Sequence, residues 1–375
     1  MKGFVFWTAY ICMHTASVFE ELGKSMHVII ACKSKEYGTF GSLNLSNVEI
    51  KLIKDKSDVD LLIGKTRDYV HINAALKPYK GIEDLGYALY SLLKNHLMVM
   101  ALNVEAFQWW GVKGILRRIQ WFYLYNIGIG RKIKAIGCTG ITGILAHRKA
   151  FISQNRLFDF IYSVPAPNSY LLEDHSTESL DVGMNVENHD VVRFVYVGQI
   201  IPRKCILDVV RVFNSIASKY RFDIIGGGPQ EDHLKRLIEA NDSIHYWGKI
   251  KPDQVRNILK QTDVLILSSQ LEGWGCTVNE ALMYGNKVIV SDAVGSKALI
   301  QNRDFCGQIF KSGDWNELKS CIEHEISQGI PSAQLKQRIA NWAQCIYPSA
   351  EADYFLKIIN YYITGESLKP IAPWQ

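Results

Sequence analysis

The sequence has little of what marks metal-binding, disulfide-stabilised or membrane-spanning proteins. Its eight cysteines lie far apart, with no CxxC pair and no cluster of Cys and His at the spacing of metal ligands. We therefore expect reduced, mostly buried thiols and a cytoplasmic protein. No run approaches the roughly 18 apolar residues of a membrane-spanning helix, and no low-complexity tract is present. These absences favour a globular chain without a metal centre.

The composition is that of a globular protein with an uneven charge. With 375 residues, of which 48% are hydrophobic and 21% charged, the chain is long enough for two domains of roughly 150 to 200 residues each. The net charge is +9 through Asp159 and −4 beyond it. Between Lys94 and Arg156 there are ten basic residues and a single acidic one, Glu105. Something anionic is expected to meet this basic region.

The first residues, MKGFVFWTAYICMHTAS, have the lysine and apolar run of a possible signal peptide. Trp7, Thr8 and Tyr10 interrupt that run, and SVFEELGKS and MHVIIAC continue as a helix and a strand. A strand followed by a helix and a second strand is therefore the preferred interpretation of this segment.

Short apolar runs alternate with amphipathic segments along most of the chain, which predicts parallel, doubly wound sheets. The expected strands are 3–7, 26–32, 47–53, 69–75, 97–102, 134–140, 158–164, 192–199, 222–228, 244–248, 264–269 and 287–292. The expected helices are 15–23, 82–95, a long aromatic and basic stretch, 142–154, 207–220, 231–241, 252–261, 277–285, 315–328 and 349–364. The predicted fold class is α/β, with two Rossmann-like domains facing each other across a cleft.

The domain boundaries follow from a change of composition. The segment APNSYLLEDHSTESLDVGMNVENHD is polar and acidic, with no sustained period, and is interpreted as a linker. We expect an acceptor-binding domain over 1–168, a linker over 169–190 and a donor-binding domain over 191–345. The last segment, 346–375, is expected to pack back towards the first domain.

The stretch SQLEGWGCTVNEALMYG, residues 269–285, combines two carboxylates, two glycines and an exposed-looking Trp274. Gly273 and Gly275 allow a tight turn, and a helix starting at Thr277 adds bare amides and a partial positive charge. Glu272 precedes this helix and Glu280 is expected in its first turn. The pattern suits a ligand with phosphate and hydroxyl groups, although a capping box from Thr277 to Glu280 and a solvated Glu272 would also explain it.

Two other strand ends carry comparable residues. GQIIPRKC places Gly198 after a strand and Arg203 and Lys204 just before a helix, where two cations can neutralise a diphosphate. A solvated basic pair is the alternative, but cations at a helix start oppose the helix dipole, which favours a functional reason. IIGGGPQED contributes Gly228 and allows close approach of a ligand, without the GxGxxG spacing of a dinucleotide site.

Taken in order over roughly 190–301, these motifs resemble the donor-binding domain of the family 4 (group 1) glycosyltransferases of the two-Rossmann GT-B type. Glu272 and Glu280 match the E-x7-E pattern of that family. The resemblance implies transfer of a sugar from a nucleotide-sugar donor, a UDP- or GDP-sugar, with retention at the anomeric carbon. It implies no cofactor and no bound metal.

The resemblance also implies roles for individual residues. Arg203 and Lys204 would hold the donor diphosphate, Glu272 would contact the donor sugar near the reacting carbon, and Glu280 would bind the ribose hydroxyls. The amides of Gly273, Trp274, Gly275, Cys276 and Thr277 would cradle sugar and phosphate, beside Gly198 and Gly228. The chain departs from the family at Gln199, Cys205 and Cys276, where an arginine, a glycine and a small aliphatic residue are usual.

The first half matches the family less well, because WTAYICMHTAS lacks the usual glycine pair. Glu105, the only acid in the basic segment, and His14, near the end of the first strand, are tentative catalytic residues that could act on the acceptor hydroxyl. A structural or solvated role is the alternative for each.

The stretch WWGVKGILRRIQWFYLYNIGIGRKIK, residues 109–134, interleaves aromatic and aliphatic residues with basic ones. This pattern is typical of an interfacial helix that meets anionic headgroups. A core-facing helix with a solvated basic face is the main alternative, and no nucleic-acid-binding module supports a nucleic acid partner. The expected membrane or acceptor contacts are Trp109, Trp110, Lys113, Arg117, Arg118 and Trp121.

The sequence thus leads to one hypothesis and two rivals. The hypothesis is a retaining, metal-independent glycosyltransferase, cytoplasmic and peripheral on the inner face of the cytoplasmic membrane. It would transfer a sugar to a lipid-linked glycan in surface polysaccharide biosynthesis, as for O-antigen, capsule or exopolysaccharide. A nucleotide-sugar epimerase of the same fold and a noncatalytic nucleotide-sugar-binding protein are the alternatives.

Overall fold

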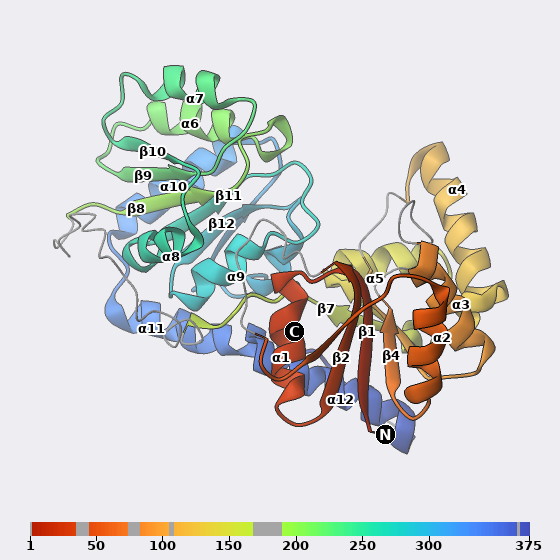
Figure 1. Ribbon diagram of the computed structural model, residues 1–375. Helices are drawn as coiled ribbons and strands as arrows, with labels where there is room; N and C mark the ends of the chain where they lie inside the picture. The colour runs from red at the N-terminus through yellow and green to blue at the C-terminus, as the bar shows by residue number, and fades with distance from the viewer. Residues whose placement is uncertain (1, 35–44, 74–82, 105–108, 168–189, 366–367) are drawn as a thin grey trace. The chain divides into compact units, whose positions relative to one another are not determined.

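The computed structural model describes residues 2–34, 45–73, 83–104, 109–167, 190–365 and 368–375 (Figure 1). The chain forms two compact units. Unit 1 comprises residues 1–165 and 346–375, and unit 2 comprises residues 166–345. The last thirty residues therefore belong to the same unit as the first strand.

Unit 1 is built on a parallel sheet of seven strands in the order β3-β2-β1-β4-β5-β6-β7. The strands are β1 Gly3–Tyr10, β2 His27–Ser34, β3 Glu49–Leu52, β4 Val70–Asn73, β5 Val99–Val104, β6 Ala135–Thr139 and β7 Leu157–Phe160. The helices are α1 Met13–Gly23, α2 Lys56–Lys65, α3 Glu83–Lys94, α4 Gly111–Phe122, α5 Gly140–Lys149 and α12 Pro348–Thr364.

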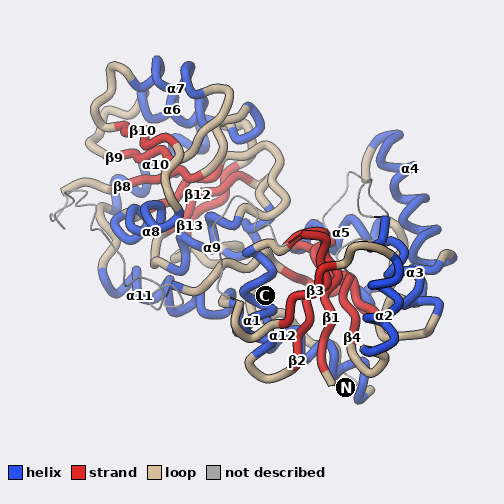
Figure 2. Tube along the Cα trace, viewed as in Figure 1, coloured by secondary structure: helices blue, strands red, loops and turns tan. Residues whose placement is uncertain are grey.

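Strand β1 shows why helices cover both faces of this sheet (Figure 2). Successive side chains of a strand point to opposite faces, and both sets of β1 are buried. Val5 and Trp7 join the core beneath α2 and α3. Phe4 packs on Phe355 of α12, with ring centroids 5.3 Å apart, and Phe6 stacks on Phe19 of α1 at 3.6 Å.

Unit 2 is built on a parallel sheet of six strands in the order β10-β9-β8-β11-β12-β13. The strands are β8 Arg193–Val197, β9 Arg221–Ile225, β10 Ile244–Gly248, β11 Val264–Leu267, β12 Lys287–Ser291 and β13 Gly307–Phe310. The helices are α6 Ile206–Asn214, α7 Glu231–Ile238, α8 Pro252–Gln261, α9 Cys276–Met283, α10 Trp315–Gln328 and α11 Ala333–Trp342. This is the doubly wound Rossmann order, in which the chain reverses direction across the sheet between β8 and β11.

The α/β class and the doubly wound sheets are confirmed, while several elements differ from expectation. Helix α2 was not expected: its apolar residues are few, but Asp55 caps it by accepting from the amides of Ser57 and Asp58. Strand β13 and helix α11 were also not expected. The expected long aromatic helix is broken, because α4 ends at Phe122 and is followed by a π-helical turn, Tyr123–Ile127, and a 3-10 turn, Ile129–Lys132.

Within the described ranges, no helix combines the length and the apolar character needed to cross a bilayer.

Candidate functional site

The candidate site lies where the carboxyl ends of β8 and β11 diverge, at the switch point of unit 2. Two hydrogen bonds to main-chain carbonyls join the loops that follow these two strands: the amide of Gln270 donates to the carbonyl of Arg203 at 2.8 Å, and the Ser268 hydroxyl donates to the carbonyl of Lys204 at 2.8 Å. Ligands of open α/β sheets bind at such a point. The two loops therefore form one fixed platform at the expected place.

The first loop presents both predicted cations in a single short turn. Pro202, Arg203 and Lys204 form a 3-10 turn, and α6 begins at Ile206. Between turn and helix stands Cys205 with a φ of 55°, in the left-handed region that glycine adopts without steric cost. Cys205 thus stands where the resembled family usually has glycine, and the left-handed conformation of its backbone explains why glycine is usual there.

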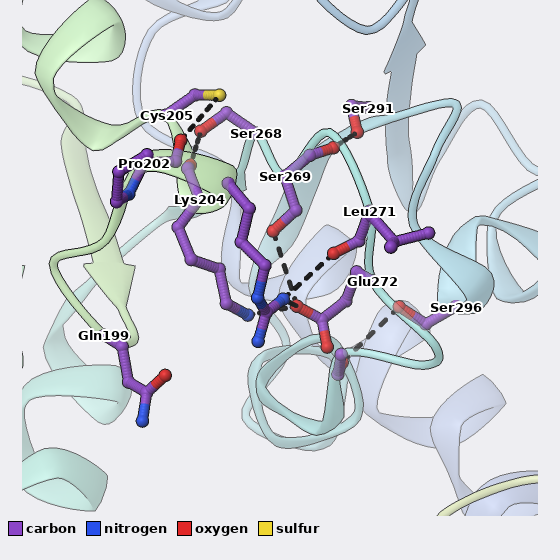
Figure 3. A network of polar contacts seen from close by, with 12 residues as sticks. Gln199, Pro202, Lys204, Cys205, Ser268, Ser269, Leu271, Glu272, Ser291 and Ser296 are labelled. Carbon is purple, nitrogen blue, oxygen red and sulfur yellow. Dashed lines mark hydrogen bonds and ion pairs between the residues drawn. The ribbon is translucent and has the colours of Figure 1, made fainter.

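A carboxylate of the second loop meets both cations (Figure 3). The Lys204 ammonium donates to Oε2 of Glu272 in a short contact, and Nη1 of Arg203 lies 3.3 Å from the same oxygen. Nη1 of Arg203 also donates to the carbonyl of Leu271 at 2.9 Å, and the Ser269 hydroxyl is 3.4 Å from Oε2. Residues 68 or more positions apart in sequence are therefore gathered into one polar network.

The members of this network differ in exposure. The side chains of Lys204 and Glu272 are 11% and 16% exposed, whereas that of Arg203 is 47% exposed. A mostly buried ammonium and carboxylate need each other, because a buried charge without a partner is costly. The network therefore has a desolvated core, with the guanidinium at its accessible edge.

The main chain of Glu272 is held by a third loop, which follows β12. Its amide donates to the carbonyl of Ala293 at 3.3 Å, and its carbonyl accepts from the amide of Gly295 at 3.1 Å. A Cβ at residue 295 would lie 2.1 Å from the carbonyl oxygen of Gly273, so only glycine allows this approach. The backbone beneath the carboxylate is thus fixed from two sides.

Helix α9 begins one residue earlier than expected, at Cys276 instead of Thr277, with Gly275 at φ 95° as its N-cap. Glu280 is therefore the fifth residue of the helix and not in its first turn as expected, and the alternative of a capping box from Thr277 to Glu280 is wrong. The first amides of a helix have no acceptor within it. Cys276 and Thr277 are the first two residues of α9, so their amides lie at this end of the helix.

Glu280 is a second carboxyl group with an unusual environment. Burial raises the pKa of Glu280 to about 7, while the positive charge of Arg256 acts in the opposite direction. A carboxyl group with such a pKa is partly protonated near neutrality, and it can then both donate and accept hydrogen bonds. This versatility suits recognition of hydroxyl groups.

Trp274 is not exposed, contrary to the sequence-based expectation. Its side chain is only 1% exposed, and its Nε1 donates to Oδ1 of Asn279 at 2.9 Å. The indole therefore anchors the loop to helix α9, and only the main chain of Trp274 remains suited to a ligand. Asn279 itself was missed, because an asparagine inside a predicted helix carries no signal of this contact.

The predicted glycines Gly198 and Gly228 sit in tightly packed loops. A Cβ at Gly226 would lie 1.8 Å from the carbonyl oxygen of Gly198, and a Cβ at Gly228 would lie 2.4 Å from that of Ile200. The amide of Gly228 already donates to Oε1 of Glu231 at 2.7 Å. These glycines allow the loops after β8 and β9 to approach each other, and Glu231 was not recognised from the sequence.

The two tentative catalytic residues belong to unit 1. His14 lies in α1, just after the carboxyl end of β1, and its Nδ1 is 3.2 Å from the carbonyl oxygen of Ser163. Burial lowers the pKa of His14, which favours the neutral imidazole. Glu105 lies outside the described residues.

Helix α4 carries most of the predicted membrane contacts on an exposed surface. The apolar side chains of Trp110, Val112, Ile115, Leu116, Ile119 and Tyr123 are 47% to 76% exposed. Among the cations, Lys113 and Arg117 are exposed and Arg118 is half-buried. Gly114 packs on the chain at Trp109, where a Cβ would lie 2.4 Å from the main chain. Exposed apolar and basic residues thus share one helix.

Trp121, also predicted as a membrane contact, is half-buried and faces the core of unit 1. Its ring stacks on Tyr125 with centroids 5.4 Å apart, and it packs against the core of unit 1. The sequence could not distinguish it from Trp110, since both lie in the same aromatic stretch.

Over the part of the chain that the structure describes, no group of three or more His, Cys, Asp or Glu residues is arranged to hold a metal ion. The ion pairs of the candidate site are those of Glu272 with Arg203 and Lys204.

The candidate site lies within a segment of the chain that is similar to known proteins. Residues 183–342 match the family model of the glycosyl transferases group 1. Over 135 residues the chain is 24% identical to the lipopolysaccharide 1,6-galactosyltransferase of Escherichia coli, which covers 34% of this chain and 38% of that protein. The chain thus aligns with well under two thirds of that relative's length.

Solved structures extend the likeness to nearly the whole chain. The lipopolysaccharide outer core galactosyltransferase WaaB in its apo form superposes with a TM-score of 0.68 at 14% identity, over 97% of this chain and 100% of that one. Alr3699/HepE of Anabaena, in complex with UDP, gives a TM-score of 0.69 at 12% identity, over 96% and 100%. At these identities the likeness concerns the fold. The chain therefore has the fold of the GT-B glycosyltransferases, and the sequence of its second unit matches that of the glycosyl transferases group 1.

Proposed function

We propose that the protein is a retaining, metal-independent glycosyltransferase of family 4, a hexosyltransferase that uses a nucleotide-sugar donor, a UDP- or GDP-sugar. Its acceptor is a lipid-linked glycan in surface polysaccharide biosynthesis. The observation that carries the proposal is the meeting of Arg203, Lys204 and Glu272 at the switch point of a unit that matches the glycosyl transferases group 1. The relatives named above, a lipopolysaccharide galactosyltransferase and a protein in complex with UDP, support the substrate class.

The chemistry of sugar transfer gives each of these residues a task. Breaking the glycosyl phosphate bond develops negative charge on the departing nucleoside diphosphate and positive charge on the sugar ring. Fixed cations stabilise the first and a nearby carboxylate the second. In this proposal the guanidinium of Arg203 and the ammonium of Lys204 receive the diphosphate, and Glu272 lies beside the reacting sugar.

The amino-terminal end of α9 and Glu280 complete the donor site in this proposal. The first amides of α9 and the partial positive charge of the helix end favour phosphate oxygens. Glu280, whose pKa burial raises to about 7, accepts hydrogen bonds from the ribose hydroxyls. The cations supply the charge that a divalent ion supplies elsewhere, so no metal is required.

The surface of α4 supports an acceptor at a membrane. Apolar side chains exposed beside Lys113 and Arg117 fit a bilayer surface with anionic headgroups. We place the protein in the cytoplasm, peripheral on the inner face of the cytoplasmic membrane, where a lipid-linked glycan would be within reach. His14 and Glu105 remain candidates for a contact with the acceptor hydroxyl.

A transfer assay with Glu272→Ala tests the proposal. The purified protein is incubated with a panel of nucleotide sugars in the presence of a chelator, and released nucleoside diphosphate is measured. We expect slow hydrolysis of one donor by the wild-type chain and a loss of about 100-fold or more in the variant, since the carboxylate acts on the transition state. Glu323→Gln, an exposed acid of α10, serves as the control.

Two outcomes would contradict the proposal. If no nucleotide sugar is hydrolysed or protects the wild-type protein against thermal unfolding, the donor assignment fails. If Glu272→Ala retains full biological activity while still binding nucleotide, the protein is a sensor and no transferase.

A further inference from the structure

The carboxylate of Glu272 pairs with the same two cations that the proposed function assigns to the donor diphosphate. Its Oε2 accepts from the Lys204 ammonium and from the Ser269 hydroxyl, and it lies 3.3 Å from Nη1 of Arg203. We infer that Glu272 is a built-in counter-ion of these cations, which the diphosphate of the donor must displace. The inference rests on the proposed function and adds a competing anion to it.

Repulsion between like charges requires that the diphosphate replace the carboxylate of Glu272 at the cations. A carboxylate and a diphosphate that both contact Lys204 would bring like charges within a few ångströms of each other, which is unfavourable in a site this buried. Lys204 is only 11% exposed, so it needs an anionic partner at all times. Glu272 provides that partner until the more highly charged diphosphate replaces it.

The surrounding main chain allows this exchange without a rearrangement of the loops. The contacts of Gln270 with Arg203 and of Ser268 with Lys204 end on main-chain carbonyls. The amide and carbonyl of Glu272 are held by the loop after β12. In this exchange the side chains of Glu272 and Arg203 turn, and the carboxylate released from the cations becomes available to the donor sugar.

This role makes a prediction opposite in sign to that of a simple ligand contact. Neutralising a charged residue that only binds the ligand lowers the affinity of the protein for that ligand. Neutralising an internal competitor raises the affinity for the diphosphate, even though transfer is lost. Glu272→Gln separates the two roles, because glutamine keeps the shape of the side chain and removes its charge.

Calorimetric titration with inorganic pyrophosphate and with UDP tests the inference independently of the donor sugar. We expect Glu272→Gln to bind both about tenfold more tightly than the wild-type chain. Glu323→Gln changes the net charge equally, at an exposed pair with Lys319, and should leave both affinities unchanged. Equal or weaker binding by Glu272→Gln overturns the inference while the proposed function stands. If pyrophosphate and all nucleoside diphosphates fail to bind any of the proteins, the proposed function falls and the inference with it.

A crystal structure of the wild-type chain with pyrophosphate gives a second test that needs no variant. The expected result is a phosphate oxygen within hydrogen-bonding distance of the Lys204 ammonium, with the Glu272 carboxylate turned away from it. Persistence of the pair between Lys204 and Glu272 beside a bound pyrophosphate would overturn the inference.

Discussion

The two units share a strand order but differ at the point where each sheet changes direction. In unit 2 the loops after β8 and β11 are joined by hydrogen bonds to main-chain carbonyls and bring Lys204 and Glu272 together. In unit 1 the corresponding strands are β1 and β4. After β1 the chain passes directly into α1 with no glycine between them. The same scaffold thus supports an ion-paired site in one unit and a different kind of surface in the other.

The units also differ in how they hold their buried acids. In unit 2, the carboxylate of Glu272 pairs with the side chains of Lys204 and Arg203. In unit 1, burial raises the pKa of Glu351 to about 8 and that of Asp159 to about 6, so near neutral pH Glu351 favours the protonated form and Asp159 remains mostly ionised. Asp159 accepts from Trp374 and Gln375 at the end of the chain. Glu272 is thus paired with cations within unit 2, whereas Asp159 of β7 joins the returning carboxyl-terminal residues to the sheet of unit 1.

Among the variants that test this difference between the units, we expect the largest effect from charge reversal on α4 of unit 1. The double variant Arg117→Glu and Arg118→Glu should release the protein from anionic vesicles. Each basic residue near such a surface contributes about 1 kcal/mol, so losing two attractive charges lowers the partition coefficient by roughly 30-fold, and reversal lowers it further. Sedimentation with vesicles of phosphatidylserine and phosphatidylcholine measures the partition.

The control variant for this experiment is Arg211→Glu. Binding of UDP by the double variant serves as a second control, which reports on unit 2. Arg211 is half-exposed on α6 of unit 2 and pairs with Asp208, so its reversal should leave sedimentation nearly unchanged. Undiminished sedimentation of the double variant would end the membrane proposal, while the donor site of unit 2 would be unaffected.

A smaller effect is expected from the buried acid of α12. A folded-state pKa above the usual 4.5 means that the folded protein retains a proton that the unfolded chain gives up. Stability is therefore lost as the pH rises from about 4.5 to about 8. Glu351→Gln should remove roughly 1 to 3 kcal/mol of this pH dependence.

Urea unfolding at pH 5, 6, 7 and 8 measures this effect. The control is Asp353→Asn, at an exposed acid on the same helix. Its free energy of unfolding should depend on pH as that of the wild-type protein does. If the unfolding free energy of Glu351→Gln depends on pH as that of the wild-type protein does, Glu351 is not the group that titrates.

The sequence predicted the parts of unit 2 whose signal is local. Apolar strands, the break before Arg203 and the glycines at 273 and 275 depend on a few neighbouring residues, and the structure places them as expected. The burial of Trp274 and the contact between Lys204 and Glu272 depend on partners distant in space or outside any motif. No local pattern announces them.

In unit 1 the missed features have similar causes. Helix α2 has only Val59, Leu62 and Ile63 buried, too few for a clear period, and its cap at Asp55 marks it better than its apolar residues. Trp121 and Trp110 occur in one aromatic stretch, and only packing on Tyr125 separates the inward ring from the outward one. The sequence indicates the aromatic stretch but does not show which of its rings point inward and which point outward.

We propose above all that unit 2 binds a nucleoside diphosphate through protein groups, Arg203 and Lys204 foremost, without a metal ion. The most direct test is calorimetric titration of the wild-type chain and of Lys204→Ala with UDP and GDP, both in excess chelator. We predict binding of one nucleotide by the wild-type chain without metal and a loss of affinity of about tenfold or more in the variant, as one charge-assisted contact is removed. Binding that requires added metal, or that Lys204→Ala leaves unchanged, would contradict it.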